Sequence, residues 1–120
     1  MAERGVVLSL DEGTTGATAV VVGLDGEIRA KGYREITQHY PQPGWVEHDP
    51  LEIWSAVQLS AQEALHAAGA GPGDVRAVGI TNQRETLVVW DRRTLEPLAP
   101  AIVWQAVSYT HLTLPTIYSV

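Results

Sequence analysis

Hydrophobic residues in the first forty positions fall into short runs that are typical of β-strands. The runs Val6–Leu10 and Ala17–Leu24 are rich in β-branched residues, and Asp25-Gly26, directly after the second run, is a strong signal for a hairpin turn. A further run, from Glu27 to about His39, alternates imperfectly between polar and apolar residues, which indicates a partly exposed antiparallel strand. The pattern therefore predicts three strands that follow one another as a meander.

The next segment, residues 40–69, begins with a stretch in which no regular structure is expected and continues with a predicted helix. The stretch YPQPGWVEHDP, residues 40–50, is dense in proline and glycine. Asp49 is suited to cap a helix that begins with Pro50, and Glu52 completes a pattern similar to a capping box. Gly69 is suited to end that helix. Between the two ends, apolar residues recur at helical spacing: Ile53, Trp54, Val57, Ala61, Ala64, Leu65 and Ala68.

Strand-like runs return after the helix. VRAVGIT (residues 75–81) and TLVVW (86–90) predict two strands with NQRE between them, and APAIVW (99–104) predicts a last strand after a turn at DRRT. Over the main elements the order is β-β-β-α-β-β, in which a meander is joined to a helical crossover. This order predicts an α/β fold with a mixed sheet.

Composition narrows the class of protein. At 120 residues and 45% hydrophobic, the chain suits one modest domain. Its net charge of −6, with no segment rich in Lys or Arg, favours a small-molecule partner over nucleic acid or an anionic membrane. Without cysteine, neither disulfides nor a thiolate metal site are available. The N-terminus carries only one short apolar run, Val6–Leu10, which is shorter than the core of a secretory signal, and no stretch approaches the length of a membrane span, so we expect a cytoplasmic protein.

The polar segment between the first two strands has the composition of an anion site. Residues Asp11–Gly16 read DEGTTG, which offers consecutive backbone N–H groups, two hydroxyls, and glycines that allow a positive φ and the close approach of a phosphate. Asp11 would repel a phosphate unless a cation lies between them, as Mg²⁺ does in phosphoryl-transfer sites. The alternative is an ordinary turn. The segment is not a Walker A loop, because it has no Gly-Lys-Ser/Thr and a strand follows it.

A second polar group lies where the run VRAVGIT ends. Arg84 and Glu85 place five N–H donors beside a strong acceptor, which matches the vicinal hydroxyls of a polyol. The alternative is a surface ion pair worth under about 1 kcal/mol. Trp104 is suited either to line a pocket or to fill a core. Three histidines show no metal-ligand spacing and are interpreted as structural or solvated: His39, His48 and His66.

Four motifs together resemble a known family: LDEGTTGATAVVV, YPQPGWVEHDPLEIW, VGITNQRETLVVW and AIVWQ. They resemble the N-terminal part of the glycerol kinases, in the sugar-kinase family whose fold is similar to that of actin and hexokinase. The resemblance runs from about Val6 to Gln105 with the elements in register. It implies a truncated ribonuclease-H-like domain of the actin-like ATPase kind at residues 1–105. It also implies a cytoplasmic, homo-oligomeric full-length enzyme that transfers a phosphoryl group from ATP to glycerol, giving glycerol 3-phosphate, largely by positioning and charge neutralisation.

The resemblance also implies roles for individual residues. The cofactors would be ATP and Mg²⁺, the latter held at Asp11. The nucleotide phosphates would be gripped by the first hairpin: Asp11, Gly13, Thr14 and Thr15. The glycerol side of the site would be formed by Arg84 and Glu85 on the hydroxyls, with Trp104 lining the pocket.

The chain departs from the family pattern in the first hairpin. Glu12 stands where a glutamine is usual, and Gly16 and Ala17 stand in place of serines. Thr18 takes the place of an arginine that helps to hold the nucleotide phosphates, so it can offer a hydroxyl but not a charge.

The C-terminal part of the chain departs further. Residues 106–120 resemble translated adapter sequence and are interpreted as a non-native tail, the alternative being a genuine final strand. The family's catalytic aspartate and adenine-binding domain are expected beyond residue 120, so we expect this fragment to be inactive alone. Two other functions stay open: a kinase for another polyol or a ketose, and a non-catalytic ligand-binding module.

Overall fold

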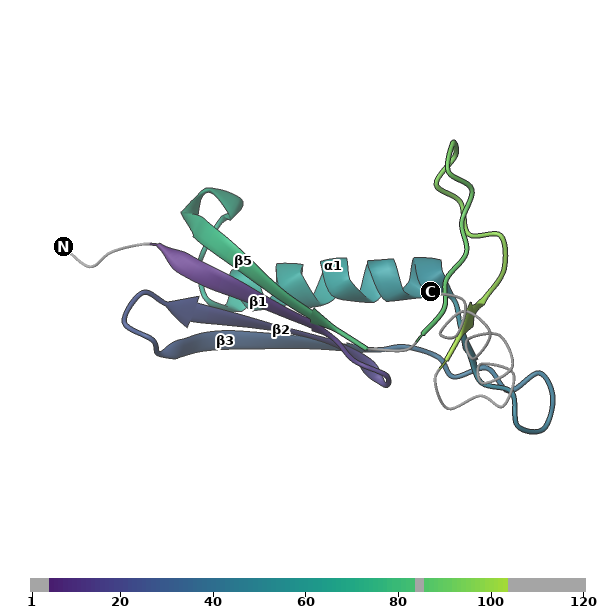
Figure 1. Cartoon of the computed structure of the whole chain (residues 1–120). Helices are drawn as coiled ribbons and strands as arrows, with labels where there is room; N and C mark the ends of the chain where they lie inside the picture. Colours follow the sequence, from purple (N-terminus) through teal and green to yellow (C-terminus); the bar gives the residue numbers. More distant parts are fainter. Residues whose placement is uncertain (1–4, 84–85, 104–120) are drawn as a thin grey trace, which may run out of the picture. The chain divides into compact units, whose positions relative to one another are not determined.

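The computed structural model describes residues 5–83 and 86–103, which form two compact units (Figure 1). The sheet unit consists of the described residues up to Ile36 together with Ile53–Asn82. The hairpin unit consists of Thr37–Glu52 and the described residues from Gln83 onward.

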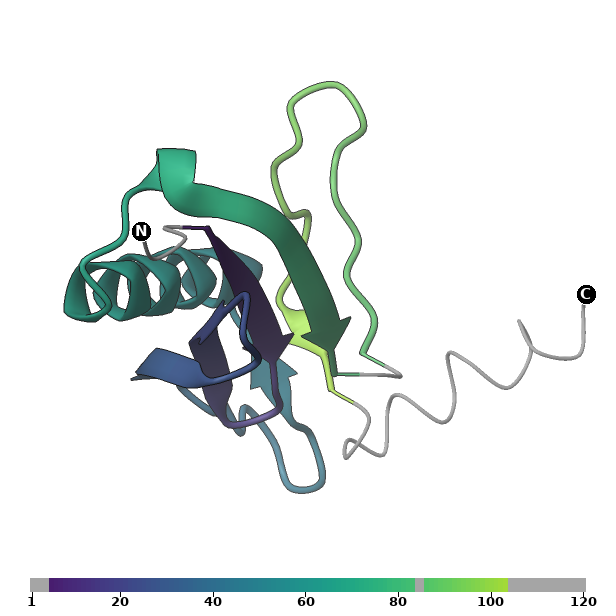
Figure 2. The ribbon, with the colours of Figure 1, turned by 90° about the vertical axis from the view of Figure 1, so that its left-hand side faces the viewer.

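The sheet unit is built on four strands: β1 (Val6–Glu12), β2 (Gly16–Gly23), β3 (Ile28–Glu35) and β5 (Val75–Asn82). Their order across the sheet is β3-β2-β1-β5. The pairs β1–β2 and β2–β3 are antiparallel, whereas β5 runs parallel to β1, beside which it is seen in Figure 2. The predicted meander and the mixed sheet are therefore confirmed.

The turn between β2 and β3 forms as the sequence predicts. Gly26 has a φ of +88°, which a residue with a side chain rarely adopts. The carboxylate of Asp25 accepts a hydrogen bond of 3.0 Å from the N–H of Glu27 and so closes the turn. The next strand, β3, ends at Glu35 rather than near His39, because His39 pairs instead with Glu47 in the hairpin unit.

The predicted helix is α1 (Pro50–Ala67), and Asp49 and Gly69 mark its two ends as predicted. The Oδ1 atom of Asp49 accepts a hydrogen bond of 2.9 Å from the N–H of Leu51, which caps the first turn. Gly69 has a φ of +68°, and the N–H of Ala70 donates to the carbonyl of Leu65, which is the pattern of a Schellman cap. A short 3₁₀ helix, η1 (Pro72–Asp74), then leads into β5.

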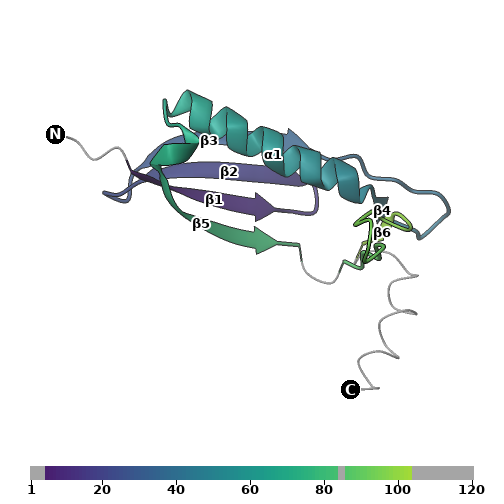
Figure 3. The same ribbon diagram turned by 90° about the horizontal axis from the view of Figure 1, so that it is seen from above.

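The core of the sheet unit lies between α1 and one face of the sheet (Figure 3). The helix contributes small buried residues, Ala56, Ser60 and Ala64, at a spacing of four. The sheet contributes buried residues mainly from β1 and β2: Val6, Leu8, Ala17, Ala19 and Val21. Trp54, which the helical pattern included among the apolar positions, is instead 60% exposed.

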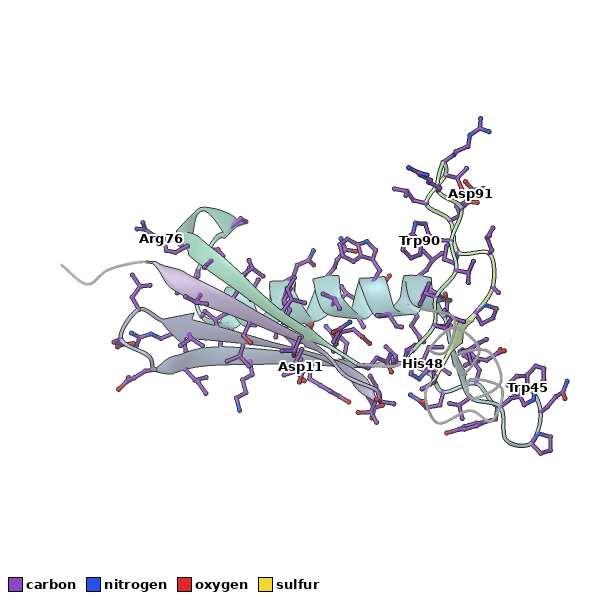
Figure 4. All side chains as sticks on the ribbon, viewed as in Figure 1. Asp11, Trp45, His48, Arg76, Trp90 and Asp91 are labelled. Atoms are coloured by element: carbon purple, nitrogen blue, oxygen red, sulfur yellow. The ribbon has the colours of Figure 1, made fainter. Side chains whose placement is uncertain are left out.

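The hairpin unit holds a second, much smaller sheet formed by β4 (Glu47–His48) and β6 (Ala101–Ile102), which pair antiparallel. β4 lies within the proline-rich stretch that was expected to lack regular structure. Val46 and Val103 form the buried centre of this unit. The described part of its hairpin, residues 86–100, carries Trp90 and Asp91 (Figure 4).

The prediction of a strand at TLVVW is wrong. Leu87 and Trp90 each form an isolated bridge, to Ile102 and Pro97 respectively, and no ladder joins them. The two bridges are not in one register: continuing from Trp90–Pro97 would put Pro100, which has no N–H to donate, opposite Leu87, and Leu87 pairs with Ile102 instead. The predicted last strand is confirmed only at Ala101–Ile102.

Candidate functional site

The turn between β1 and β2 is tighter than its composition suggested. The N–H of Gly13 donates a hydrogen bond of 2.9 Å to the carbonyl of Gly16, and the carbonyl of Thr15 accepts one of 3.0 Å from the N–H of Ile36. The N–H of Gly13 is thus used within the turn. Gly13 and Gly16 do not have a positive φ. The hydroxyl-bearing Thr14 and Thr15 lie at the tip, where Thr15 is exposed.

Gly16 is required by packing inside the sheet. A Cβ atom at this position would lie 2.4 Å from the carbonyl oxygen of Arg34 and 2.6 Å from the hydroxyl of Tyr33, both in β3. The space beside Gly16, which the sequence analysis attributed to a phosphate, is therefore filled by the neighbouring strand β3. This also gives a physical reason for glycine at a position where the family pattern has serine.

Asp11 lies near the end of β1 and is exposed (Figure 4). The buried residues of β1, Val6 and Leu8, face α1, so strand alternation puts Asp11 on the opposite face of the sheet. There its Oδ1 atom accepts a hydrogen bond of 3.1 Å from the hydroxyl of Thr81. Sequence reasoning missed Thr81, because only the parallel register of β1 and β5 brings residues 70 positions apart side by side.

The donor set at this place fits Mg²⁺ in its usual mode of binding. Mg²⁺ keeps several waters and is commonly held by one or two carboxylates together with substrate phosphates. Asp11 supplies one exposed carboxylate at the strand end. Among the described residues no cluster of three or more His, Asp or Glu side chains is placed to hold an ion without phosphate or water.

Thr18 shares the face of Asp11. The antiparallel register of β1 and β2 puts Thr18 directly opposite Asp11, so both side chains project from the same side of the sheet. Arginine at this position in the family pattern would therefore place its charge beside the carboxylate of Asp11. In this chain a hydroxyl takes that place.

The second predicted group lies outside the described residues. Arg84, Glu85 and Trp104, the residues expected to hold glycerol, therefore stay predictions. Gln83, which directly precedes Arg84, is described and belongs to the hairpin unit.

His48, which the sequence analysis interpreted only as structural or solvated, contacts the side chain of Gln83. His48 is fully buried, with 0% of its surface exposed (Figure 4). Its Nδ1 atom lies 3.2 Å from Nε2 of Gln83, and its Nε2 atom lies 2.7 Å from Oε1 of Gln38. Burial lowers the pKa of His48; the carboxylate of Glu52 opposes this shift and His39 adds to it.

The segment that carries His48 is fixed by two further sets of contacts. The carboxylate of Glu52, which the sequence assigned to a capping box, instead accepts hydrogen bonds of 2.8 Å from both the N–H and the hydroxyl of Thr37. His39 and Glu47 exchange two backbone hydrogen bonds, of 3.0 and 2.9 Å. No sequence signal pointed to these contacts, because the partners are far apart and follow no periodicity.

The hairpin unit also contains a hollow of about 720 Å³. It is lined by residues 39–41, by Glu47, and by residues 49–51 and 97–100, of which four are prolines. Elsewhere, no helix in the described part of the chain is long and apolar enough to cross a membrane.

The chain is closely similar to known kinases. It is 54% identical over 101 residues to the glycerol kinase of Rhizobium rhizogenes and 56% identical over 99 residues to that of Thermus brockianus. These matches cover 84% and 82% of this chain but 20% of each relative, so the chain spans about a fifth of the length of the curated relatives it matches.

Solved structures give the same result for the fold. The structure of Plasmodium falciparum glycerol kinase with ADP matches 97% of this chain with a TM-score of 0.77 and 30% identity, and the chain covers 23% of it. Xylulose kinase from Rhodospirillum rubrum matches 96% of this chain with a TM-score of 0.77 and 27% identity, and the chain again covers 23%. The α/β fold is that of a sugar-kinase N-terminal domain, a fragment of the actin-like ATPase fold.

The model of the N-terminal domain of the FGGY family of carbohydrate kinases matches residues 6–111 of the 120. The chain therefore belongs to the FGGY family of carbohydrate kinases.

Proposed function

We propose that the protein to which this segment belongs transfers the γ-phosphoryl group of ATP to a terminal hydroxyl of glycerol, giving glycerol 3-phosphate and ADP. The observation that carries this proposal is identity of 54–56% to curated glycerol kinases over most of the chain. A cytoplasmic location and a homo-oligomeric assembly belong to the same proposal, as the family resemblance implies.

The first hairpin would serve the nucleotide. The hydroxyls of Thr14 and of the exposed Thr15, at the tip of this hairpin, would donate to phosphate oxygens. Asp11, on the open face of the sheet, would hold Mg²⁺ directly or through its waters. When bound, that ion neutralises charge on the phosphates. Gly13, whose N–H is bonded to Gly16, would contribute through the shape of the turn.

Arg84 and Glu85 would hold the glycerol hydroxyls, and Trp104 would cover its carbon–hydrogen face. In the reaction, the hydroxyl oxygen forms a bond to the γ-phosphorus while the bond from that phosphorus to the bridging oxygen of ADP breaks. The hydroxyl proton passes to a base that we assign to the part of the curated relatives that this chain does not span. A site that pairs with substrate hydroxyls rejects analogues lacking them by about 10⁴-fold.

The test is a chimaera in which the matched segment of this chain replaces its counterpart in the Thermus brockianus glycerol kinase. We expect glycerol-dependent formation of ADP, and Arg84→Ala or Glu85→Ala should raise the KM for glycerol at least about tenfold with little change in the KM for ATP. Unchanged glycerol kinetics in both variants would reject their assigned role.

A kinase for a ketose is the second candidate, because a xylulose kinase matches the fold as well as a glycerol kinase does, with a TM-score of 0.77 for each. Assays of the chimaera with glycerol, xylulose and ribulose separate the two. Glycerol should have the highest kcat/KM, and a higher value for either ketose would favour the second candidate.

A further inference from the structure

The hairpin unit contains three hydrogen-bonded polar side chains: His48, which is fully buried, and the part-buried Gln38 and Gln83. His48 lies in β4 and is 0% exposed, and both of its ring nitrogens are within hydrogen-bond distance of a glutamine amide. A buried polar group is costly unless its hydrogen bonds are made, so this arrangement has a stringent geometric requirement.

With the two glutamine amides oriented as in this structure, the partners select one protonation state of the ring. The Oε1 atom of Gln38 can only accept, so the facing Nε2 atom of His48 must carry a hydrogen. The amide nitrogen of Gln83 can only donate, so Nδ1 must present a lone pair. Both bonds form only with the neutral ring protonated on Nε2, and burial, which lowers the pKa of His48, favours that neutral form. The charged or titratable neighbours that act on the ring are Glu52 and His39.

Gln38, at one end of these three side chains, lies in a segment that is held by further hydrogen bonds. Gln38 lies between Thr37, whose N–H and hydroxyl both bond to Glu52, and His39, which is paired with Glu47. The backbone of His48 is itself paired with Ala101 in β6. The ring of His48 therefore presents its Nδ1 atom to Gln83 from a fixed position.

Gln83, at the other end of these three side chains, is next in the sequence to the residues proposed to bind glycerol, Arg84 and Glu85. Gln83 follows the last residue of β5 and directly precedes Arg84 in the sequence. We propose that His48 is a positioning residue for the polyol side of the site, and that it acts by holding the amide of Gln83, the residue that directly precedes Arg84 in the sequence. This inference rests on the function proposed above.

Two substitutions of similar size separate positioning from general stabilisation. His48→Asn puts an amide near the place of Nδ1, where its oxygen can accept from Gln83, and loses the bond to Gln38. His48→Gln puts an amide near the place of Nε2, where its nitrogen can donate to Gln38, and loses the bond to Gln83. Each variant gives up one part-buried hydrogen bond, so a purely structural role predicts the same effect for both.

In the chimaera, we expect His48→Gln to raise the KM for glycerol about tenfold, while His48→Asn stays within about threefold of the parent. The KM for ATP should be unchanged in both. Gln83→Leu should raise the KM for glycerol at least as much as His48→Gln, because it removes this contact together with the other interaction of Gln83, and adding His48→Gln to Gln83→Leu should change nothing further. Equal KM values for glycerol in the Asn and Gln variants, or an equal rise in the KM for ATP, would overturn the proposal.

A spectroscopic measurement keeps this inference separate from the proposed function. In ¹⁵N-histidine-labelled parent protein, Nδ1 of His48 should be unprotonated and Nε2 protonated at pH 7. A proton on Nδ1 would overturn the proposed contact, in which Nδ1 accepts from Gln83, whatever the substrate is. A parent chimaera without glycerol-dependent turnover would instead overturn the proposed function, and the ¹⁵N signals would still decide whether His48 accepts from Gln83.

Discussion

At the scale of single residues, burial makes His48 a source of pH-dependent stability. Burial lowers its pKa below the ordinary value of 6.5, so the unfolded chain takes up a proton more readily than the folded one. The stabilisation by the neutral ring is therefore complete above about pH 6.5 and is lost as the pH falls through the lowered pKa of the folded state.

Urea unfolding of the chain and of its His48→Asn variant at pH 7.5 and 5.5 checks this prediction. The parent should lose more stability between the two pH values than the variant, which has no group to titrate at this position. Asp25 and Asp91 also have lowered pKa values, because backbone N–H groups donate to them, but they titrate at more acidic pH and are present in both proteins. An identical pH dependence in both proteins would contradict the prediction.

Single residues also mark how far the sequence could predict the site. Asp11 could be placed at a strand end from the local pattern alone, and the structure puts it there. Its contact with Thr81 and the contact of His48 with Gln83 depend on pairings between distant segments, which no local pattern contains. Gly13 and Gly16 show a second limit of sequence-based prediction. Glycine is suited both to a phosphate site and to a close contact with neighbouring backbone, so the residue type alone does not tell the two apart.

At the scale of elements, the distance between α1 and the sheet depends on a glycine. A Cβ atom on Gly32 in β3 would lie 2.2 Å from the backbone carbonyl oxygen of Ser60 in α1, and backbone cannot move aside cheaply. Gly32→Ala should therefore lower the free energy of unfolding by about 1–3 kcal/mol. Gly79→Ala in β5 is the matched control, because a Cβ atom there meets nothing within 4 Å.

Alanine is the better strand residue where space allows, so the control should be neutral or stabilising by up to about 1 kcal/mol. Urea unfolding midpoints of the two variants and the parent provide the measurement. Equal midpoints for Gly32→Ala and Gly79→Ala would show that the helix can shift away from the sheet without cost.

The first hairpin carries a prediction at the same scale, because the register of β1 and β2 puts Thr18 on the face of Asp11. Thr18→Arg should lower the KM for ATP in the chimaera by about tenfold, since a guanidinium there can form charge-assisted hydrogen bonds to phosphate. Thr18→Gln is the control, with a long polar side chain and no charge. The gain should shrink at high salt. An equal effect of Arg and Gln would show that charge is not the missing component.

Elements were predicted well where local signals and tertiary pairing agree. The Asp25-Gly26 turn and the capped helix α1 carry their own boundary signals, and both formed as expected. The run TLVVW has strand composition, but a strand also needs a partner that can complete a ladder. Here Pro100 stands where the register of the Trp90–Pro97 pair would continue opposite Leu87, so no ladder forms and composition alone misled.

At the scale of the whole molecule, the fold class could be predicted from the order of elements, whereas the substrate could not. The order of strands and helix indicates an α/β fold, which glycerol and xylulose kinases share with equal TM-scores. The evidence for glycerol comes instead from residue-level motifs and from the identity to curated relatives. The fold therefore indicates only the class of reaction, and the substrate depends on the side chains of the site.

The isolated chain gives the decisive test at this scale. Val78 and Ile80 of β5 are 51% and 71% exposed, so the chain presents apolar surface that favours self-association in water. The chain also spans only a fifth of its curated relatives, and kinases of this kind work by holding two substrates at once. We therefore expect calorimetry on the isolated chain to detect no binding of glycerol or ATP, while the chimaera turns both over. Saturable heat with glycerol from the isolated chain would instead identify a self-sufficient binding module, and the kinase activity would then need a separate demonstration.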